Sequence, residues 1–351
     1  MMKTKLVALI AALILVSNIA AVAKTDERSK RAKARQVSRL TTLLPASDAI
    51  AVFDAQRFFN DALPRILAAN QPVLAQMRSK MAEIQTKTGI DLTKFHQAVV
   101  GIAFKQLADG KIDYEPVVLA GGEGNATALA SIAKLASNGS YREETIDGHT
   151  VYVFSAKSVL QNSTAPSASG NVTATVNDAI DKLTMDVAVT ALDDNTLALG
   201  TLDRVRETIE GRTHVGADLT ALIAQRETAV ASFAMRPIGG MAKLLPLDDD
   251  DLGQSLNGIR YLSGSVDFSS IGGTLSLAAK TEKAAQAENL KSTLDGLKTL
   301  GKALLGGSKR PDQQMYARLI DSARVTQRLN NVGLELSVSQ ADLDKLVGMI
   351  K

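Results

Sequence analysis

Residues 332–338 have the sequence VGLELSV, in which valine and leucine occupy every second position and small or polar residues lie between them. Residues 185–191, with the sequence MDVAVTA, show the same alternation of larger apolar residues. Successive side chains of a strand point to opposite faces, so this pattern predicts strands with one buried face and one wetter face. Such strands are typical of antiparallel sheets.

Turn residues join the predicted strands into hairpins. Residues 141–146 and 149–154 flank Asp147-Gly148, a pair typical of a type I′ turn. Two further hairpins are predicted around residues 193–195 and 269–273, where polar and glycine residues separate alternating segments. Other apolar segments predict further strands, at residues 48–54, 97–105 and 115–120.

Apolar residues with helical spacing predict helices between the strands. A stripe in residues 283–304 contains Ala287, Leu290, Leu294, Leu297 and Leu304. A second stripe, in residues 311–329, contains Met315, Leu319 and Ala323. Further helices are predicted at residues 58–67, 73–88 and 126–136. We expect the helices to pack on one face of the antiparallel sheet, which makes the predicted fold class α+β.

The order of the predicted elements indicates an internal duplication. Residues 49–53 and 229–233 are similar apolar strands, each followed by a helical stretch, two strands and a helix. We therefore expect two diverged α+β repeats, at residues 44–212 and 213–351, with a mobile insertion near 155–180 in the first repeat. Chance similarity among strands rich in alanine and valine is the alternative.

Residues 44–52 have the sequence LPASDAIAV, which is echoed by the apolar strand at 229–233. In this motif and in the order of its elements, the chain resembles a family of uncharacterised exported bacterial proteins. Their mature domains begin with a Leu-Pro-Ala-(Asp/Ser) strand and contain two diverged α+β repeats. The resemblance implies this fold for most of residues 44–351, but it implies no catalytic residue and no ligand.

The first 23 residues have the three parts of an export signal. Lys3 and Lys5 are basic, residues 6–16 are apolar, and Ala21-Val22-Ala23 matches a cleavage site. We expect cleavage and therefore a periplasmic or secreted protein. The alternative is an N-terminal membrane anchor, since residues 6–23 form a mainly apolar stretch of 18 residues.

A basic segment follows the signal, and we expect residues 24–43 to be a disordered linker. Its residues 24–39 include seven basic and two acidic residues. Four of them are candidates for weak peripheral contact with an anionic membrane surface: Lys30, Arg31, Lys33 and Arg35. A solvated linker without such contact is the alternative. Beyond this segment the chain is slightly acidic, which argues against nucleic-acid binding.

Several kinds of chemistry lack the residues that they need. The chain has no cysteine, which excludes disulfides, thiolate catalysis and iron–sulfur ligation. His96, His149 and His214 are far apart in sequence and form no metal-binding motif, so we predict that they lie at strand ends or on the surface. Asp248 to Asp251 depart from the calcium-loop pattern and are predicted to cap a helix, with loose binding of an ion as the alternative. No metal and no cofactor is predicted.

Short matches to catalytic motifs occur in the wrong context. Residues 131–134 match the S-x-x-K motif of serine acylases and residues 87–89 match their K-T-G motif, but in the reverse chain order. Residues 121–125 join a strand to a helix but lack the Lys-Ser/Thr ending of a phosphate loop, and we predict a turn there. No catalytic residue is predicted.

The expected function is therefore non-catalytic. We expect an exported or cell-envelope protein that binds a protein, a lipid or a wall polymer through its sheet and helix surface. The alternative is a hydrolase whose reacting groups converge only in the fold. Converging carboxylates or a Ser–His pair would favour the hydrolase, and an apolar groove between helices and sheet would favour the binding protein.

Overall fold

The computed structural model describes residues 39–88, 94–107, 112–123, 126, 141–155, 186–226, 229–238, 258–307 and 310–349. The predicted leader lies outside these residues, as does the linker up to residue 38 with Lys30, Arg31, Lys33 and Arg35. The predicted insertion near 155–180, apart from Ser155, also lies outside them. Of the predicted helix at 126–136, only Ala126 is described, and it is helical.

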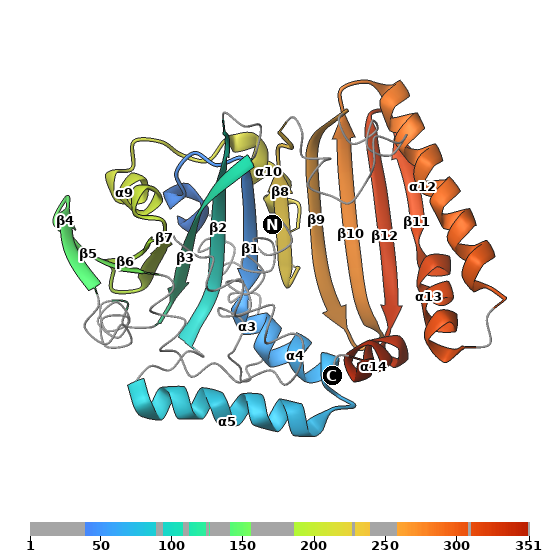
Figure 1. Cartoon of the computed structure of the whole chain (residues 1–351), viewed down its shortest axis with the longest axis horizontal. Coiled ribbons are helices and arrows are strands. Elements are labelled where there is room, and N and C mark those ends of the chain that lie inside the picture. Colours follow the sequence, from blue (N-terminus) through green and yellow to red (C-terminus); the bar gives the residue numbers. More distant parts are fainter. Residues whose placement is uncertain are drawn as a thin grey trace. The chain divides into compact units, whose positions relative to one another are not determined.

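The chain divides into two compact units (Figure 1). The first contains the described residues up to Ser47, Asp54–Phe59 and Gln76–Gly216. The second contains Asp48–Phe53, Asn60–Ala75 and the described residues from Ala217 onward. The main division follows Gly216, but two segments near the N-terminus group with the second unit, which a linear division at residues 212/213 does not anticipate.

The first unit contains an antiparallel sheet of six described strands. Its order is β2 (Phe95–Gln106), β3 (Ile112–Gly122), β7 (Thr196–Gly200), β6 (Asp186–Asp193), β5 (His149–Ser155) and β4 (Tyr141–Ile146). The turn between β4 and β5 has positive φ at both Asp147 and Gly148, as a type I′ turn requires. The outer strand β4 carries three charged residues, Arg142, Glu143 and Glu144.

The second unit also contains six described antiparallel strands. Their order is β11 (Arg324–Arg328), β12 (Asn331–Ser339), β10 (Gly272–Thr281), β9 (Ile259–Ser269), β8 (Ala231–Met235) and β1 (Ala49–Asp54). The alternation in residues 332–338 has the predicted effect, since Val332 is buried whereas Glu335 and Ser337 on the other face are exposed. The outer strand β11 carries Arg324 and Arg328. The predicted α+β class with antiparallel strands is confirmed.

Four strands follow the same order in both units, β2-β3-β7-β6 in the first and β9-β10-β12-β11 in the second. In each case a hairpin pairs through its second strand with the second strand of a later hairpin. A helix follows that last strand in both units, α9 (Leu202–Glu210) after β7 and α14 (Gln340–Met349) after β12. A duplication would produce this equivalence, and the duplication itself stays a prediction.

The predicted helix at residues 311–329 is wrong over its last third. α13 (Pro311–Ser322) ends before Arg324, and β11 then pairs with β12 through a tight turn. Leu329 in this turn has a φ of 53°, a left-handed conformation that reverses the chain. Pairing with β12 therefore prevails over the helical spacing that continues past Ser322.

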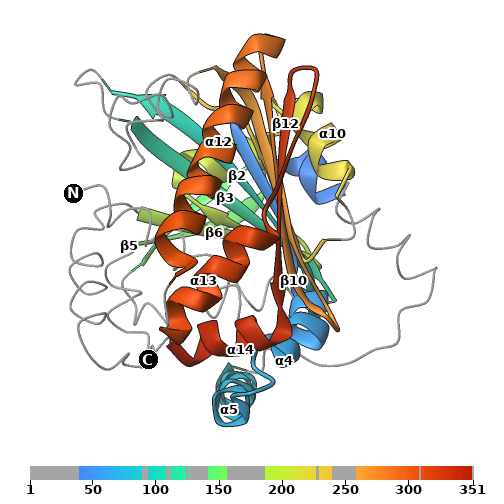
Figure 2. The same cartoon turned by 90° about the vertical axis from the view of Figure 1, so that its right-hand side faces the viewer.

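Helices cover parts of both faces of the second unit's sheet. Figure 2 shows α12 (Ala284–Leu305) and α13 on one side of the strands and α10 (Ala217–Ala224) on the other. α10 packs against β8 and buries Leu219 and Ile223. Among the helices of the described residues, none combines the length and the hydropathy that crossing a membrane requires.

The predicted helix at 58–67 is interrupted by a π-helical turn, and the one at 73–88 is slightly longer than expected. α3 (Ala55–Arg57), η1 (Phe58–Ala62) and α4 (Leu63–Ile66) follow β1, and α5 (Gln71–Thr88) comes next. The first turn of α14, near the C-terminus, is held by a reciprocal cap. In this cap the Ser339 hydroxyl donates to the Asp342 carboxylate and accepts from the Asp342 amide. Arg318 of α13 also binds this carboxylate.

The Leu-Pro-Ala-Ser motif surrounds a buried arginine in the first unit. Arg204 of α9 is 2 % exposed, and its guanidinium donates to the Ser47 hydroxyl at 2.8 Å and pairs with Glu207. Ser47 in turn donates to the Pro45 carbonyl at 2.8 Å. Gly101 of β2 leaves room for this contact, because a Cβ there would lie 2.7 Å from the Ser47 hydroxyl oxygen. The motif thus has a structural role.

Replacing Ser47 with alanine should lower the free energy of unfolding by about 1–3 kcal/mol, because a buried guanidinium loses an acceptor. Urea unfolding at neutral pH measures this change. Thr42→Ala is the matched control, since it removes an exposed hydroxyl that donates to the Arg39 carbonyl, and its effect should stay within about 0.5 kcal/mol. Equal effects of the two substitutions would contradict the role assigned to Ser47.

An ion pair attaches α10 to the end of β8. Arg236 donates to both carboxylate oxygens of Asp218, at 2.8 and 2.6 Å. Hydrogen bonds from the Arg236 guanidinium lower the pKa of Asp218 from 3.8 to about 2, and a hydrogen bond from Tyr261 contributes. Since the folded-state pKa is lowered, the carboxylate stabilises the fold above about pH 4, and this contribution is lost as the pH falls towards 2.

Asp218→Asn should lower the free energy of unfolding by about 1 kcal/mol at pH 6. This difference from the native protein should vanish near pH 2. The value allows for solvent screening, because both side chains are about one-third exposed. Urea titrations of both proteins across this range measure the difference. A difference that stays constant with pH would show that the carboxylate charge does not contribute.

Candidate ligand-binding surface

Six partly exposed side chains form an apolar face on the second unit's sheet: Val266 and Phe268 of β9, Leu275 and Leu277 of β10, and Leu334 and Leu336 of β12. Leu275 lies directly opposite both Val266 and Leu336 in the strand register. Directly opposed residues of antiparallel strands point to the same face, so the six side chains share one surface. We call this surface the apolar face.

α12 covers only one end of this side of the sheet. Ala287 and Leu290 in its first half pack in a buried cluster with Ile259, Ala279 and Val332. The cluster lies at the end of the strands where β12 begins and β10 ends. The six residues of the apolar face lie farther along the strands and keep part of their surface exposed.

The second half of α12 differs from the sequence prediction. The apolar stripe was expected to cover the sheet along its whole length. Instead, Leu297, Leu300 and Leu304 are 47 %, 57 % and 71 % exposed. The helix therefore packs on the sheet through its first half and presents leucines to solvent in its second half.

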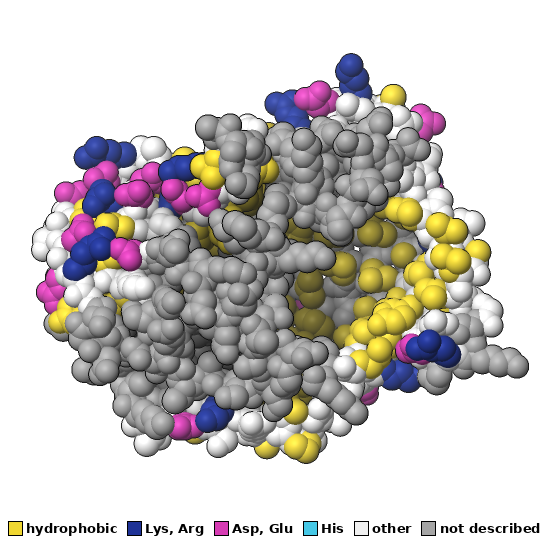
Figure 3. All heavy atoms as spheres, viewed as in Figure 1, with side chains coloured by type: hydrophobic (Ala, Val, Ile, Leu, Met, Phe, Trp, Pro, Cys, Tyr) yellow, Lys and Arg dark blue, Asp and Glu magenta, His cyan; other side chains and the backbone are white. Residues whose placement is uncertain are grey.

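Figure 3 shows hydrophobic side chains gathered in a hollow over β9, β10 and β12, beside α12. This is the side of the sheet that carries α12 and α13 in Figure 2. The six side chains of the apolar face are aliphatic or phenyl groups, so none of them can donate or accept a strong hydrogen bond. The surface suits an apolar ligand.

Gly264 shapes the floor of the hollow. A Cβ at this position would lie 2.5 Å from the Phe233 ring and 2.7 Å from Cδ2 of Leu277. Without a side chain, Phe233 and Leu277 close over the backbone of β9 from both neighbouring strands. The absence of a side chain at Gly264 therefore lets these two large apolar groups approach each other.

The opposite side of the same strands is polar. Ser276 of β10 lies between Ser265 and Glu335 in the strand register, so all three share that side. Arg226 donates to the Ser265 hydroxyl at 2.9 Å. The contrast between the two sides of these strands follows from the alternation in the sequence.

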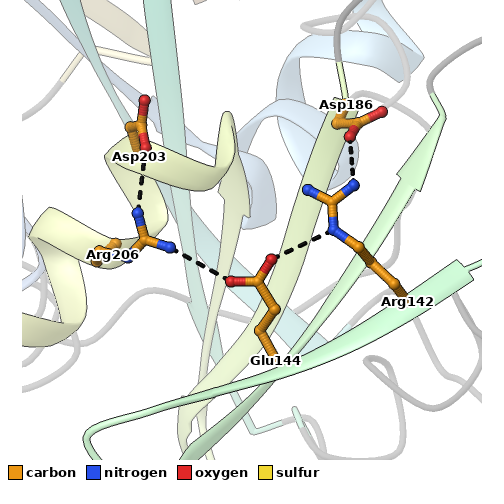
Figure 4. Close-up of polar contacts among 5 residues, drawn as sticks. All are labelled: Arg142, Glu144, Asp186, Asp203 and Arg206. Atoms are coloured by element: carbon orange, nitrogen blue, oxygen red, sulfur yellow. Dashed lines mark hydrogen bonds and ion pairs between the residues drawn. The ribbon is translucent and has the colours of Figure 1, made fainter.

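A chain of ion pairs crosses the first unit (Figure 4). Arg142 of β4 contacts Asp186 of β6 at 2.7 Å and Glu144 at 3.2 Å. Arg206 of α9 contacts Glu144 and Asp203, both at 3.3 Å. The hydrogen bonds that Arg142 donates, first to Asp186 and then to Glu144, raise the pKa of its guanidinium, which stays charged.

This chain of charges attaches the outer strand β4 to β6 and α9. Each of its three carboxylates contacts an arginine. The arrangement fits a structural role on an exposed surface.

The three histidines occupy the predicted kinds of position. His96 is the second residue of β2, and His149 begins β5, with Nδ1 3.1 Å from the Ala191 carbonyl oxygen. His214 is exposed after α9. Among the described residues, no group of three His, Asp or Glu side chains could hold a metal ion.

The glycines at 121 and 122 belong to β3 and not to the predicted turn. A Cβ on Gly122 would lie 2.1 Å from the Lys94 carbonyl oxygen, so close approach of the β2 backbone explains this glycine. The turn itself, at residues 124–125, lies outside the described residues. So do residues 131–134, Gly89 of the K-T-G match, and Asp248 to Asp251.

No family model and no curated protein matches this chain. Among solved structures, crystal form I of TP0453 aligns with a TM-score of 0.43 and 9 % identity, over 89 % of this chain and 96 % of that chain. Crystal form IV of TP0453 aligns with a TM-score of 0.44 and 10 % identity, over 88 % and 95 % of the two chains. A likeness this distant carries no information about activity.

Gly264→Ala should lower the free energy of unfolding by about 1–3 kcal/mol, because the added methyl group collides with Phe233 and Leu277. Gly296→Ala in α12 is the matched control, since a Cβ there meets nothing within 4 Å. Alanine in a helix interior should stabilise the protein by about 0.5–1 kcal/mol relative to glycine. Urea unfolding at one low protein concentration measures both, and changes of the same sign would contradict the packing described at Gly264.

Proposed function

We propose that this chain is a non-catalytic exported or cell-envelope protein that binds the acyl chain of a lipid on its apolar face. The observation that carries the proposal is the partly exposed surface of aliphatic and phenyl side chains in the hollow of Figure 3. Contiguous exposed apolar surface on a folded protein commonly marks a ligand or partner site.

Among the three partner classes expected from the sequence, a lipid fits this surface best. A wall polymer presents hydroxyl and amide groups, which lose hydrogen bonds to water when they meet aliphatic side chains. A protein partner would need a polar rim with matched hydrogen bonds around its apolar centre. An acyl chain needs only apolar area, which these six residues supply.

The dimensions of the apolar face suit one or two chains. Along the strands, the rise from the level of Leu277 and Leu334 to that of Phe268 is four residues, about 13 Å, and the three strands β9, β10 and β12 span about 10 Å. Each buried methylene contributes about 0.8 kcal/mol before the cost of association. Since a membrane binds a single fourteen-carbon chain with a constant of about 10⁴ M⁻¹, we expect a dissociation constant on the order of 10⁻⁴ M.

Export of the chain is part of the proposal and rests on residues 1–23. Their basic, apolar and small-residue parts have the order of a cleavable signal. Intact-mass measurement on protein isolated from the producing cell tests this. A mature chain beginning at Lys24 supports export with cleavage, and a retained Met1 on a chain found in the membrane fraction contradicts it.

Titration with a fluorescent tetradecanoate, labelled at the end remote from the carboxylate, tests acyl binding. Leu336→Glu should weaken binding at least about tenfold, because a charge on the apolar face must lose its hydration when the chain binds. Ser337→Glu is the matched control, since it adds the same charge to the next residue of β12 on the polar side. It should leave binding unchanged.

The fluorophore without its chain should not bind. Equal affinity of the native protein and Leu336→Glu for the labelled chain would rule out the apolar face as the site. Circular dichroism of both variants checks that each is folded.

A further inference from the structure

Basic side chains gather at one end of the second unit's sheet. It is the end at which β10 ends and β12 begins, the upper end of these strands in Figure 1. Lys280 of β10 lies directly opposite Tyr261 of β9 and Asn331 of β12. Asn331 in turn lies opposite Arg328 of β11. Directly opposed residues point to the same face, so Lys280 and Arg328 belong to one row across four strands.

A bulge in β9 adds Arg260 to this row. Lys280 pairs with Tyr261, and the next residue of β10, Thr281, pairs with Ile259, so Arg260 is the extra residue. A bulge can redirect such a side chain. The guanidinium carbon of Arg260 lies 5.9 Å from the centre of the Tyr261 ring. The Lys280 ammonium lies 5.9 Å from the same ring, so the two cations meet at one tyrosine.

The start of α12 lies beside the turn between β11 and β12. The Thr281 hydroxyl oxygen is 2.8 Å from the Lys283 carbonyl oxygen, and the Asn330 side-chain amide donates to the Thr281 carbonyl at 2.9 Å. Lys283 therefore lies at the same end of the sheet as this turn. We call the following five residues the basic end: Arg260, Lys280, Lys283, Arg328 and Leu329.

The four cations of the basic end are exposed, and in the described part of the chain none of them forms an ion pair. Five other basic side chains of this unit each contact an aspartate: Arg236, Lys291, Lys302, Arg310 and Arg318. The segments 258–262, 280–284 and 328–331 contain one acidic residue, Glu282, against these four basic ones. The basic end therefore has the charge to attract an anionic partner.

Leu329 is an unusual residue for its position. It is the first of the two residues between Arg328 and Asn331, and its φ is 53°. Glycine is favoured there, because other residues adopt a positive φ with strain. The Leu329 side chain is also 77 % exposed. Neither the backbone conformation nor contact with water favours leucine here, whereas insertion into hydrocarbon does.

We propose that the basic end docks on the surface of an anionic lipid bilayer. Leu329 enters the acyl region, and the four cations lie at the lipid phosphates, which is the usual division between apolar and basic residues at a membrane surface. A nucleic acid offers the same phosphates but no hydrocarbon for Leu329. This contact is separate from acyl binding on the apolar face, and it goes beyond that proposed function.

Sedimentation with vesicles of phosphatidylcholine and phosphatidylglycerol, about two to one, tests the docking of the mature chain that begins at Lys24. Each basic residue near an anionic surface strengthens binding about fivefold. Lys280→Gln with Arg328→Gln should therefore lower the partition constant about 30-fold. A native chain that stays in the supernatant overturns the proposal.

Lys302→Gln with Arg310→Gln is the matched control, since it removes the same charge from exposed side chains. Lys302 lies about 27 Å along α12 from its first residue. The control should bind as the native chain does. The basic residues of 24–39 stay in every variant, so their attraction cancels from the comparison. Equal weakening by both pairs would show that only net charge matters and overturn the proposal.

Leu329→Gly tests the apolar part of the contact. It should weaken vesicle binding at least about fivefold, because the inserted side chain is lost. It should also raise the urea midpoint of unfolding, since glycine adopts a positive φ without strain, so weaker binding cannot come from unfolding. Equal vesicle binding by Leu329→Gly and the native chain would reduce the basic end to a general polyanion site and overturn the proposal.

Ile271→Gly is the control for Leu329→Gly. Ile271 is 83 % exposed in the turn between β9 and β10, at the opposite end of the same strands, so its loss should leave vesicle binding unchanged. Equal weakening by the two glycine variants would also overturn the proposal. Labelled tetradecanoate should bind Leu329→Gly as tightly as the native chain, because Leu329 is not part of the apolar face. Failure of docking and failure of acyl binding are therefore separate results.

Discussion

The second unit depends on the burial of one apolar side of an antiparallel sheet. Valine and leucine at every second position of β12 point to the same side of the sheet. Exposure of that apolar side to water is unfavourable unless another element covers it. α12 supplies cover through Ala287 and Leu290, but only at one end of the strands. The apolar face remains because the helix does not follow the strands along their whole length.

A different constraint organises the first unit. The buried Arg204 needs acceptors inside the protein, and the Ser47 hydroxyl and the Glu207 carboxylate supply them. This need explains why the segment before β1 packs against α9 and β2. The short Leu-Pro-Ala-Ser motif can thus be understood from local packing and hydrogen bonding, without any role in ligand binding.

Regular alternation made the strands predictable. The segment at 332–338 coincides closely with β12, because period-two patterns reflect the geometry of a strand directly. The segments at 141–146 and 149–154 coincide closely with β4 and β5, because the Asp147-Gly148 turn between them marks a hairpin. β11 was mistaken for helix because its five residues follow a helical stripe without a glycine or proline between them. α14 was missed although Ser339 and Asp342 have the spacing of a reciprocal helix cap.

The apolar face could be predicted only in part. The alternation in β12 identified which side chains share a side, but the degree of burial depends on where a helix far away in sequence leaves the sheet. The exposed half of α12 was expected to be buried for the same reason, since a stripe of leucines does not indicate which partner it contacts. The role of Gly264 could not be predicted from the sequence either, because it depends on Phe233 and Leu277 on the neighbouring strands.

The outer strands β4 and β11 have a consequence for how this protein tolerates exposed hydrophobic surface. An uncovered edge offers free backbone groups to any other extended chain, and long flat edges seed amyloid growth. Arg142, Glu143 and Glu144 on β4, and Arg324 and Arg328 on β11, make such stacking costly at both places. Association is thereby limited to hydrophobic side-chain surfaces of limited size, and open-ended polymerisation through these two strand edges is disfavoured.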